Sequence, residues 1–254
     1  MDQEFNGKVV WIVGASGAIG AEIAQSLNAA GAVTVISGRS HEKLQALASK
    51  LGSGHHGDDT VPLDVTSATQ VNAAARGIAA RHGRIDALVN STSLSLFGDF
   101  LALDDGVWND VLEVKLMGYI RSCRAVIPYM IEQGAGNIVN ISGRSARQPI
   151  SIHLPGGCAN AAVNLLSKGL ADQYYENNLR VNVVAPGPIE SDRFARIQST
   201  HEQTTKRADA RPVLSRRMGL PSDVAQAVLW LLSDRSRHLT GTVMPVDGGS
   251  TVCL

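Results

Sequence analysis

The sequence predicts an α/β protein with a doubly wound parallel sheet in a single domain over residues 1–254, and three observations carry this prediction. Short, continuous apolar runs alternate along the chain with segments whose apolar residues recur at helical spacing. A glycine-rich turn follows the first apolar run and opens the first helical segment. No internal repeat, linker or low-complexity segment interrupts the alternation.

The expected strands are apolar runs of the kind found in strands that are buried on both faces of a parallel sheet. The first has the sequence KVVWIV, and the last closes the chain's alternating pattern. The seven predicted strands cover residues 8–13, 33–37, 60–63, 86–90, 137–141, 180–185 and 242–246.

The expected helices lie between these runs. The first has Ile19, Ile23 and Leu27 at helical spacing, and Gly31 ends it. A much longer helix is predicted from the helical spacing of the apolar residues Val107, Val111, Leu112, Leu116, Ile120 and Ile127. Besides the first, the predicted helices cover 41–51, 68–82, 103–132, a segment that opens at Pro155-Gly156-Gly157, and 222–233.

The charge and cysteine content narrow the class of protein. Lysine and arginine together number 23, as do aspartate and glutamate, so a neutral surface gives no reason to expect nucleic acid or an anionic membrane as partner. Cys123, Cys158 and Cys253 are far apart and form no CxxC pair, which predicts reduced thiols in a cytoplasmic protein and no metal site. No apolar run is long enough to span a membrane, and no signal peptide is visible.

The stretch over residues 136–171 is the expected place of the chemistry. It reads as a strand, a polar loop and a long helix, and open parallel sheets bind their ligands beyond the carboxyl ends of the strands. We therefore expect the reaction to take place between Ser142 and Asn160. The long charged segment over residues 188–221 is a probable substrate lid, with a plain surface excursion as the alternative.

The glycine turn indicates a dinucleotide. Glycines at 14, 17 and 20 allow a tight turn whose backbone N–H groups approach a pyrophosphate at the helix N-terminus. The expected cofactor-binding residues of the turn are Gly14, Ser16, Gly17, Ile19 and Gly20. A glycine triplet alone also fits a structural tight turn, but its place between a strand and a helix favours the nucleotide.

Arg39 and Ser40 follow the second predicted strand, where an acidic residue would bind the 2′-hydroxyl of NAD. No acid is present there. A guanidinium can instead pair with the 2′-phosphate of NADP, so the sequence favours NADP, with an arginine that is merely exposed as the alternative.

The chain resembles the short-chain dehydrogenases/reductases over essentially its full length. The motifs that carry the resemblance occur in the family's order: Gly14-Ala15-Ser16-Gly17-Ala18-Ile19-Gly20, Leu63-Asp64-Val65, Leu88-Val89-Asn90, Val139-Asn140-Ile141-Ser142, Arg180-Val181-Asn182, Pro186-Gly187-Pro188-Ile189 with Ser191, and Val246-Asp247-Gly248-Gly249. The resemblance implies a Rossmann-type fold and a homo-oligomer, commonly a homotetramer.

The resemblance also implies roles for single residues. Asp64 and Val65 would hold the adenine, and Asn90 would border the nicotinamide ribose. The nicotinamide and its carboxamide would lie against Pro186, Gly187, Ile189 and Ser191. The glycine turn departs from the family's TGxxxGxG at Val13 and Ala18, so we expect it to be rearranged around Gly17.

The family's catalytic tetrad of Asn, Ser, Tyr and Lys is missing. The aligned positions hold Lys115, Gly143, Gly156 and Asn160. In the family the tyrosine protonates the developing alkoxide, the lysine lowers the pKa of the tyrosine and grips the ribose, and the serine orients the carbonyl group. No tyrosine occurs between Tyr129 and Tyr174 to restore that set.

Replacements for the tetrad are nevertheless present. Ser142 or Ser145 is a candidate donor to the carbonyl oxygen, and Asn160 can bond ribose hydroxyls. Lys115 and His153 are candidate proton donors. The alternatives are that Lys115 reaches solvent or pairs with Glu113 or Asp110, and that His153 is simply exposed.

These features predict an NADP(H)-dependent oxidoreductase that reduces a small organic carbonyl compound or an activated alkene with a non-standard proton donor. Two alternatives stay open. One is a redox-neutral isomerase, dehydratase or cyclase on the same scaffold. The other is a catalytically inactive nucleotide-binding partner of an active paralogue.

Overall fold

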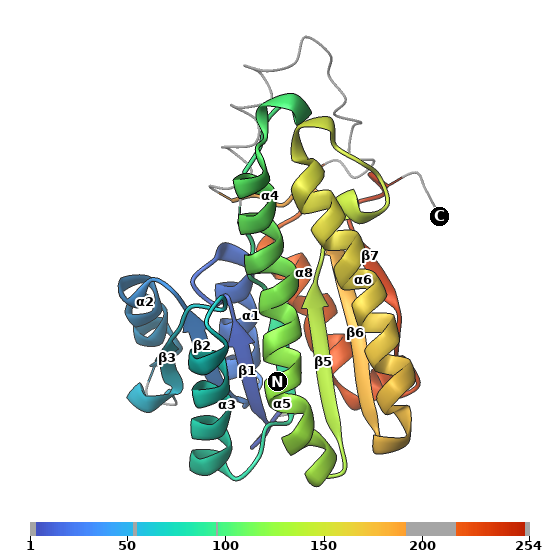
Figure 1. The fold of residues 1–254 in the computed structure, drawn as a ribbon. Coiled ribbons are helices and arrows are strands. Elements are labelled where there is room, and N and C mark those ends of the chain that lie inside the picture. Colours follow the sequence, from blue (N-terminus) through green and yellow to red (C-terminus); the bar gives the residue numbers. More distant parts are fainter. Residues whose placement is uncertain (1–3, 53–54, 95, 192–216, 252–254) are drawn as a thin grey trace.

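A parallel sheet of seven strands runs through the protein, with helices on both of its faces (Figure 1). The computed structural model describes residues 4–52, 55–94, 96–191 and 217–251. The strand order is β3-β2-β1-β4-β5-β6-β7, so the chain moves outward in one direction from β1 and then in the other from β4. This confirms the predicted doubly wound sheet and places its switch point between β1 and β4.

The strands lie where the apolar runs predict them, within one or two residues at each end. The register aligns Val13 with Asn90 and Asn90 with Asn140, so the carboxyl ends of β1, β4 and β5 meet at one edge. The strands are β1 (Val9–Val13), β2 (Val33–Gly38), β3 (Thr60–Pro62), β4 (Ala87–Asn90), β5 (Gly136–Ile141), β6 (Leu179–Pro186) and β7 (Val243–Val246).

Two helices have serine side-chain caps that fix their first residues. The Ser40 and Ser67 hydroxyls accept hydrogen bonds from the first turns of α2 and α3, and Gly83 ends α3 in the left-handed conformation. Both helices match their predicted ranges. The helices are α1 (Ala18–Ala29), α2 (His41–Leu51), α3 (Ala68–His82), α4 (Asp105–Leu112), α5 (Gly118–Glu132), α6 (Leu154–Tyr174) and α8 (Pro221–Leu232).

The predicted continuous helix over residues 103–132 is wrong in two respects. It begins at Asp105, because the Asp104 carboxylate accepts a hydrogen bond from the Val107 N–H (2.9 Å). A π-helical turn over Glu113–Met117 also separates α4 from α5. Such turns are uncommon and are frequent at functional sites. Here the wide turn carries Lys115.

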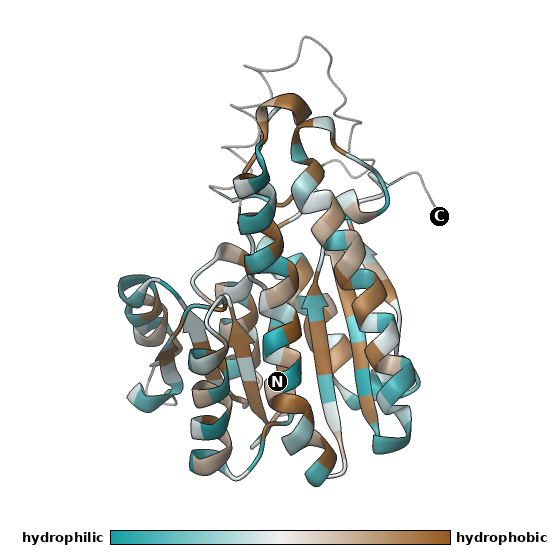
Figure 2. Cartoon of the chain, in the orientation of Figure 1, coloured by the Kyte–Doolittle hydropathy of each residue, from teal (hydrophilic) through white to brown (hydrophobic). Residues whose placement is uncertain are grey.

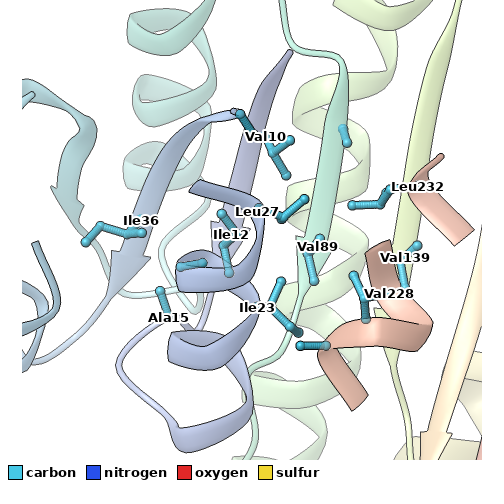
Figure 3. Packing of buried hydrophobic residues seen from close by; sticks show 14 of the residues in the cluster. Val10, Ile12, Ala15, Ile23, Leu27, Ile36, Val89, Val139, Val228 and Leu232 are labelled. Atoms are coloured by element: carbon cyan, nitrogen blue, oxygen red, sulfur yellow. The ribbon is translucent and has the colours of Figure 1, made fainter. Parts of the chain in front are cut away.

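Apolar side chains fill both spaces between the sheet and its helices. Successive residues of β1 face opposite sides, with Val10 and Ile12 in one cluster and Trp11 in the other. Figure 3 shows side chains of α1 and α8 converging on the first face, among them Ile23, Leu27, Val228 and Leu232. In Figure 2 most of β1 is apolar, whereas the covering helices alternate between apolar and polar residues. Burial on both faces explains the continuous apolar runs.

A network of buried polar side chains lies on the face of the sheet that Trp11 faces. Asn90 Nδ2 donates to Asn140 Oδ1 (2.9 Å), and Asn140 Nδ2 donates to Ser167 Oγ (2.9 Å). Ser167 Oγ donates to the Val163 carbonyl (2.7 Å), and Ser122 Oγ donates to Asn90 Oδ1 (2.7 Å). These bonds join α5, β4, β5 and α6 close to the carboxyl ends of the strands, so they fix the frame of the expected site.

Replacing Asn140 tests how much these buried hydrogen bonds stabilise the protein. Asn140→Leu keeps the number and branching of the side-chain heavy atoms but removes the oxygen that accepts from the buried Asn90 amide, so we expect the free energy of unfolding to fall by about 2–4 kcal/mol in urea denaturation. The exposed Asn72→Ala variant in α3 serves as control and should change it by less than about 0.5 kcal/mol. An Asn140→Leu variant as stable as the native protein would contradict this account.

Candidate functional site

The turn between β1 and α1 is built for close backbone approach. Gly14 has φ +93°, and a Cβ atom on it would lie 2.7 Å from the backbone of Ser91 and Thr92. A Cβ atom on Gly20 would lie 2.3 Å from the Gly14 carbonyl oxygen. Gly17 precedes α1 with φ −90°, and Ala18 begins the helix without a left-handed conformation. The substitution at Ala18 therefore strains nothing, and the turn needs no rearrangement on its account.

The N-terminus of α1 presents its amide groups to this edge of the sheet. No side chain caps the helix, and no acidic residue lies in its first turn. The first N–H groups of a helix lack partners within it and carry partial positive charge, so they favour an anion. Ile19 of this turn is half-buried against the first core. The geometry thus fits a bound phosphate group at Ser16–Gly20.

The residues after β2 lie beside this turn. A Cβ atom on Gly38 would lie 2.7 Å from Ser16 Oγ, so the two loops are in close contact. Arg39 is exposed, and its guanidinium has no hydrogen-bond or ion-pair partner among the described residues. The Ser40 hydroxyl caps α2 through the Lys43 N–H (3.3 Å). Gly14, Ser16 and Arg39 together form a cradle that fits a dinucleotide with a 2′-phosphate.

Three residues expected to hold the nucleoside parts are largely committed to the protein. Asp64 Oδ1 accepts from the Thr66 N–H and hydroxyl, both at 2.9 Å. Val65 is buried and lies 3.0 Å from the Cβ position of Gly118. The Asn90 side chain belongs to the buried polar network, so its amide points into the core. Asn90 can therefore border a ribose through its backbone only.

Residues 186–191, at and after the end of β6, lie at the same edge of the sheet. Gly187 donates its N–H to the Val246 carbonyl (2.9 Å), and a Cβ atom on it would lie 2.6 Å from Asp247 Cβ. Pro186 and Ile189 are buried, and Ser191 Oγ donates to the Ile189 carbonyl (3.3 Å). Most of the predicted lid, residues 192–216, lies outside the described residues. Its two ends pair as Ile189 with Gly219.

Lys115 points inward from the π-helical turn. The side chain is only 6% exposed, and Nζ donates to the Ile141 carbonyl at the end of β5 (2.7 Å). The ammonium lies 5.1 Å from the centroid of the Tyr119 ring. Carbonyl and ring both favour the charged ammonium. The alternative of a lysine that reaches solvent is therefore wrong.

His153 occupies the space left by the glycine at position 156. A Cβ atom on Gly156 would lie 2.0 Å from His153 Cε1 and 2.2 Å from Nε2, so the imidazole ring stands where a side chain of residue 156 would begin. His153 is only 6% exposed, and its ring packs against Phe97 with 4.7 Å between centroids. The alternative of an exposed histidine is therefore wrong as well.

Asn160 occupies the space beside Gly143, as His153 does beside Gly156. A Cβ atom on Gly143 would lie 2.9 Å from Asn160 Nδ2, which donates to Ser145 Oγ (3.0 Å). Asn160 Oδ1 is buried without a hydrogen-bond partner among the described residues, and the same is true of Ser142 Oγ. Buried polar atoms left in this way are suited to a ligand's hydrogen bonds.

Two functional candidates escaped the sequence reading. The Tyr119 hydroxyl lies 2.9 Å from the Ile141 carbonyl oxygen and 3.2 Å from that of Thr92, which joins the ends of β4 and β5. Its signal was its place four residues after Lys115, on the same helix face. Arg144 is the second residue: its guanidinium donates to the Ser250 carbonyl, and burial lowers its pKa, an effect that the nearby Asp247 opposes.

No group of three histidine, cysteine, aspartate or glutamate side chains in the described part of the chain is placed to hold a metal ion. Among the same residues, no helix is long and apolar enough to cross a membrane.

Comparison with known proteins adds relatives over nearly the whole chain. Residues 14–251 match a family model described as enoyl-(acyl carrier protein) reductase. The chain is 36% identical to nodulation protein G of Rhizobium meliloti and 32% identical to the 3-oxoacyl-[acyl-carrier-protein] reductase FabG of Thermotoga maritima, covering 97% of this chain and 98% of each relative. It is similar to the structure of a short-chain type dehydrogenase/reductase from Mycobacterium ulcerans, with TM-score 0.87, 27% identity and coverage of 98% and 91% of the two chains.

A double-mutant cycle tests the packing of His153 against position 156. Gly156→Ala should lower the free energy of unfolding by about 1–3 kcal/mol, because the added methyl group displaces the imidazole ring. In a His153→Ala background the same change should be neutral or stabilising by up to about 1 kcal/mol, since alanine favours a helix more than glycine does. Equal effects in the two backgrounds, measured in urea, would show that the ring does not fill this space.

Proposed function

The chain belongs to the short-chain dehydrogenase/reductase family, and on that basis we propose that it is an NADP(H)-dependent oxidoreductase acting on a small organic carbonyl compound or an activated alkene. The observation that carries the proposal is the nucleotide cradle, where the open N-terminus of α1 and the exposed Arg39 lie beside a turn that excludes side chains at Gly14 and Gly20. The nicotinamide, when bound, supplies or accepts the hydride.

His153 is the proposed proton donor. Its ring takes the space of the side chain absent at Gly156, beside the loop where the reaction is expected. An imidazole changes charge near neutral pH and can therefore donate a proton and be recharged from solvent. Lys115 suits this task less, because its Nζ already donates to the Ile141 carbonyl and lies over the Tyr119 ring.

Two more residues complete the proposed chemistry. The buried Ser142 hydroxyl would donate a hydrogen bond to the substrate oxygen and so stabilise charge that develops on it. Asn160 Oδ1 would accept a hydrogen bond from a ribose hydroxyl, a contact that a neutral amide can make in place of a lysine. Neither role needs a side chain at Gly143.

The substrate class follows from the chemistry that a histidine can serve. When a carbonyl group is reduced, its carbon receives the hydride and its oxygen receives a proton. The proton donor for the oxygen can also protonate an activated alkene that has accepted a hydride. The matching family model is named for an enoyl reductase and the bacterial relative for a 3-oxoacyl reductase, which are these two reaction types.

We also propose a cytoplasmic homo-oligomer, a dimer or a tetramer. A groove between α5 and α6 is lined mainly by apolar side chains, and one of them, Ile131, is 38% exposed. Water contact with so much apolar surface is unfavourable, and a second copy would cover it. Cys123 and Cys158 are free thiols, in keeping with a reducing compartment.

Nucleotide titration tests the proposed cofactor. We expect NADPH to bind the pure protein more tightly than NADH, and Arg39→Ala to weaken NADPH binding about 10- to 100-fold while leaving NADH unchanged, because a charge-assisted contact to the 2′-phosphate is lost. Arg237→Ala, an exposed arginine near the start of β6, is the matched control. Failure to bind either nucleotide, measured by fluorescence, would refute the proposal.

Substitution of His153 tests the proton donor once a ketone or unsaturated carbonyl compound that oxidises NADPH has been found in a panel. His153→Asn should lower kcat/KM about 10²- to 10⁴-fold and change the Kd for NADPH by less than about threefold, since only proton transfer is affected. An unchanged kcat/KM would exclude His153. A product formed with no change in nicotinamide absorbance would indicate the redox-neutral alternative.

A further inference from the structure

Lys115 is a buried cation that the proposed proton transfer does not use. Removing an ammonium from water is costly unless polar groups replace its hydration. Such groups are present around Lys115 Nζ: the Ile141 carbonyl oxygen lies 2.7 Å away, and the centroid of the Tyr119 ring lies 5.1 Å away. A methionine or leucine would fill this space at lower cost, so the charge calls for a functional explanation.

The charge lies at the edge of the sheet where a dinucleotide binds. Ile141 ends β5, and β5 is two strands away from β1, whose turn forms the phosphate cradle. Two strand spacings amount to about 10 Å. The loop after β4 fills the interval: Thr92 N lies 2.7 Å from the Cβ position of Gly14, and Thr92 Oγ1 donates to the Val114 carbonyl (3.2 Å). The loop after β4 thus connects the phosphate cradle with the π-helical turn along this edge of the sheet.

On α6, the position at which the resemblance places the family's lysine holds Asn160. Asn160 is neutral, and its amide nitrogen is engaged with Ser145 Oγ. The ribose of the nicotinamide half carries hydroxyl groups and stands next to the negatively charged pyrophosphate. A cation at the ends of β4 and β5 is therefore favourable for both groups.

We propose that Lys115 binds the nicotinamide-ribose half of the nucleotide, reaching it from the π-helical turn between α4 and α5. The π-helical turn directs the side chain inward, and Tyr119 holds the ammonium in place through its ring while its hydroxyl joins the ends of β4 and β5. Lys115 is then a binding residue and not the acid. This inference rests on the proposed function, because it requires that a nicotinamide nucleotide binds.

Two ligands separate this role from a purely structural one. NADPH contains the nicotinamide-ribose half, whereas adenosine 2′,5′-bisphosphate contains only the adenosine half with its phosphates. Lys115→Met keeps a long apolar side chain and removes the charge. We expect it to weaken NADPH binding about tenfold or more and to leave binding of the bisphosphate within about twofold. Lys115→Arg should restore much of the NADPH affinity, and the exposed Lys50→Met serves as control.

Fluorescence and calorimetric titrations measure the affinities, and each outcome either supports or overturns the inference. Selective loss of NADPH affinity in Lys115→Met supports the inference, and melting of the nucleotide-free variant near the native temperature shows that it is folded. Equal affinities of the native protein and Lys115→Met for NADPH overturn the inference and leave the proposed function standing. Equal weakening of both ligands also overturns it, because Lys115 then only supports the structure. If the native protein binds no NADPH, the proposed function itself fails.

Discussion

The imidazole ring of His153 and a side chain at position 156 cannot occupy the same space, and the rest of the site depends on this exclusion. The Cβ position of Gly156 lies within 2.2 Å of two ring atoms, far closer than atoms can approach. A second pair repeats the relation, since the Cβ position of Gly143 lies 2.9 Å from Asn160 Nδ2. In each pair a glycine faces a larger polar residue. At both positions the larger residue occupies the space that a side chain on the glycine would need.

The nucleotide cradle is insensitive to these replacements, because backbone atoms build most of it. Amide groups at the start of α1 and the absence of side chains at Gly14 and Gly20 provide a place for phosphate groups without any member of the usual tetrad. The buried polar network through Asn90 and Asn140 holds β4 and β5 in register beside it.

Much of the fold could be predicted from the sequence, for physical reasons that differ between elements. Strands buried on both faces leave continuous apolar runs, and α2 and α3 have serine caps that mark their first turns. The π-helical turn at Glu113–Met117 could not be predicted, because the apolar spacing continues through it and its geometry depends on tertiary packing.

The sequence predicted where polar side chains gather at the end of β5, but only some of their contacts. The stretch from Ser142 to Asn160 does gather the polar residues, and Lys115 and His153 do point into the protein. Which space His153 fills depends on where the missing Cβ of Gly156 would lie, and no spacing along the chain reveals that. Tyr119 could not be predicted from the family's motif, which places the tyrosine at the start of α6, because this tyrosine comes from α5.

A crystal structure of the chain grown with NADP+ would show whether the nucleotide binds at the cradle with its nicotinamide beside the proposed proton donor, His153. We expect the pyrophosphate on the first turn of α1, the nicotinamide ribose between Lys115 and Asn160, and the nicotinamide ring beside Ser142 and His153. A nucleotide bound with its nicotinamide away from His153, or an empty crevice at saturating NADP+, would contradict it.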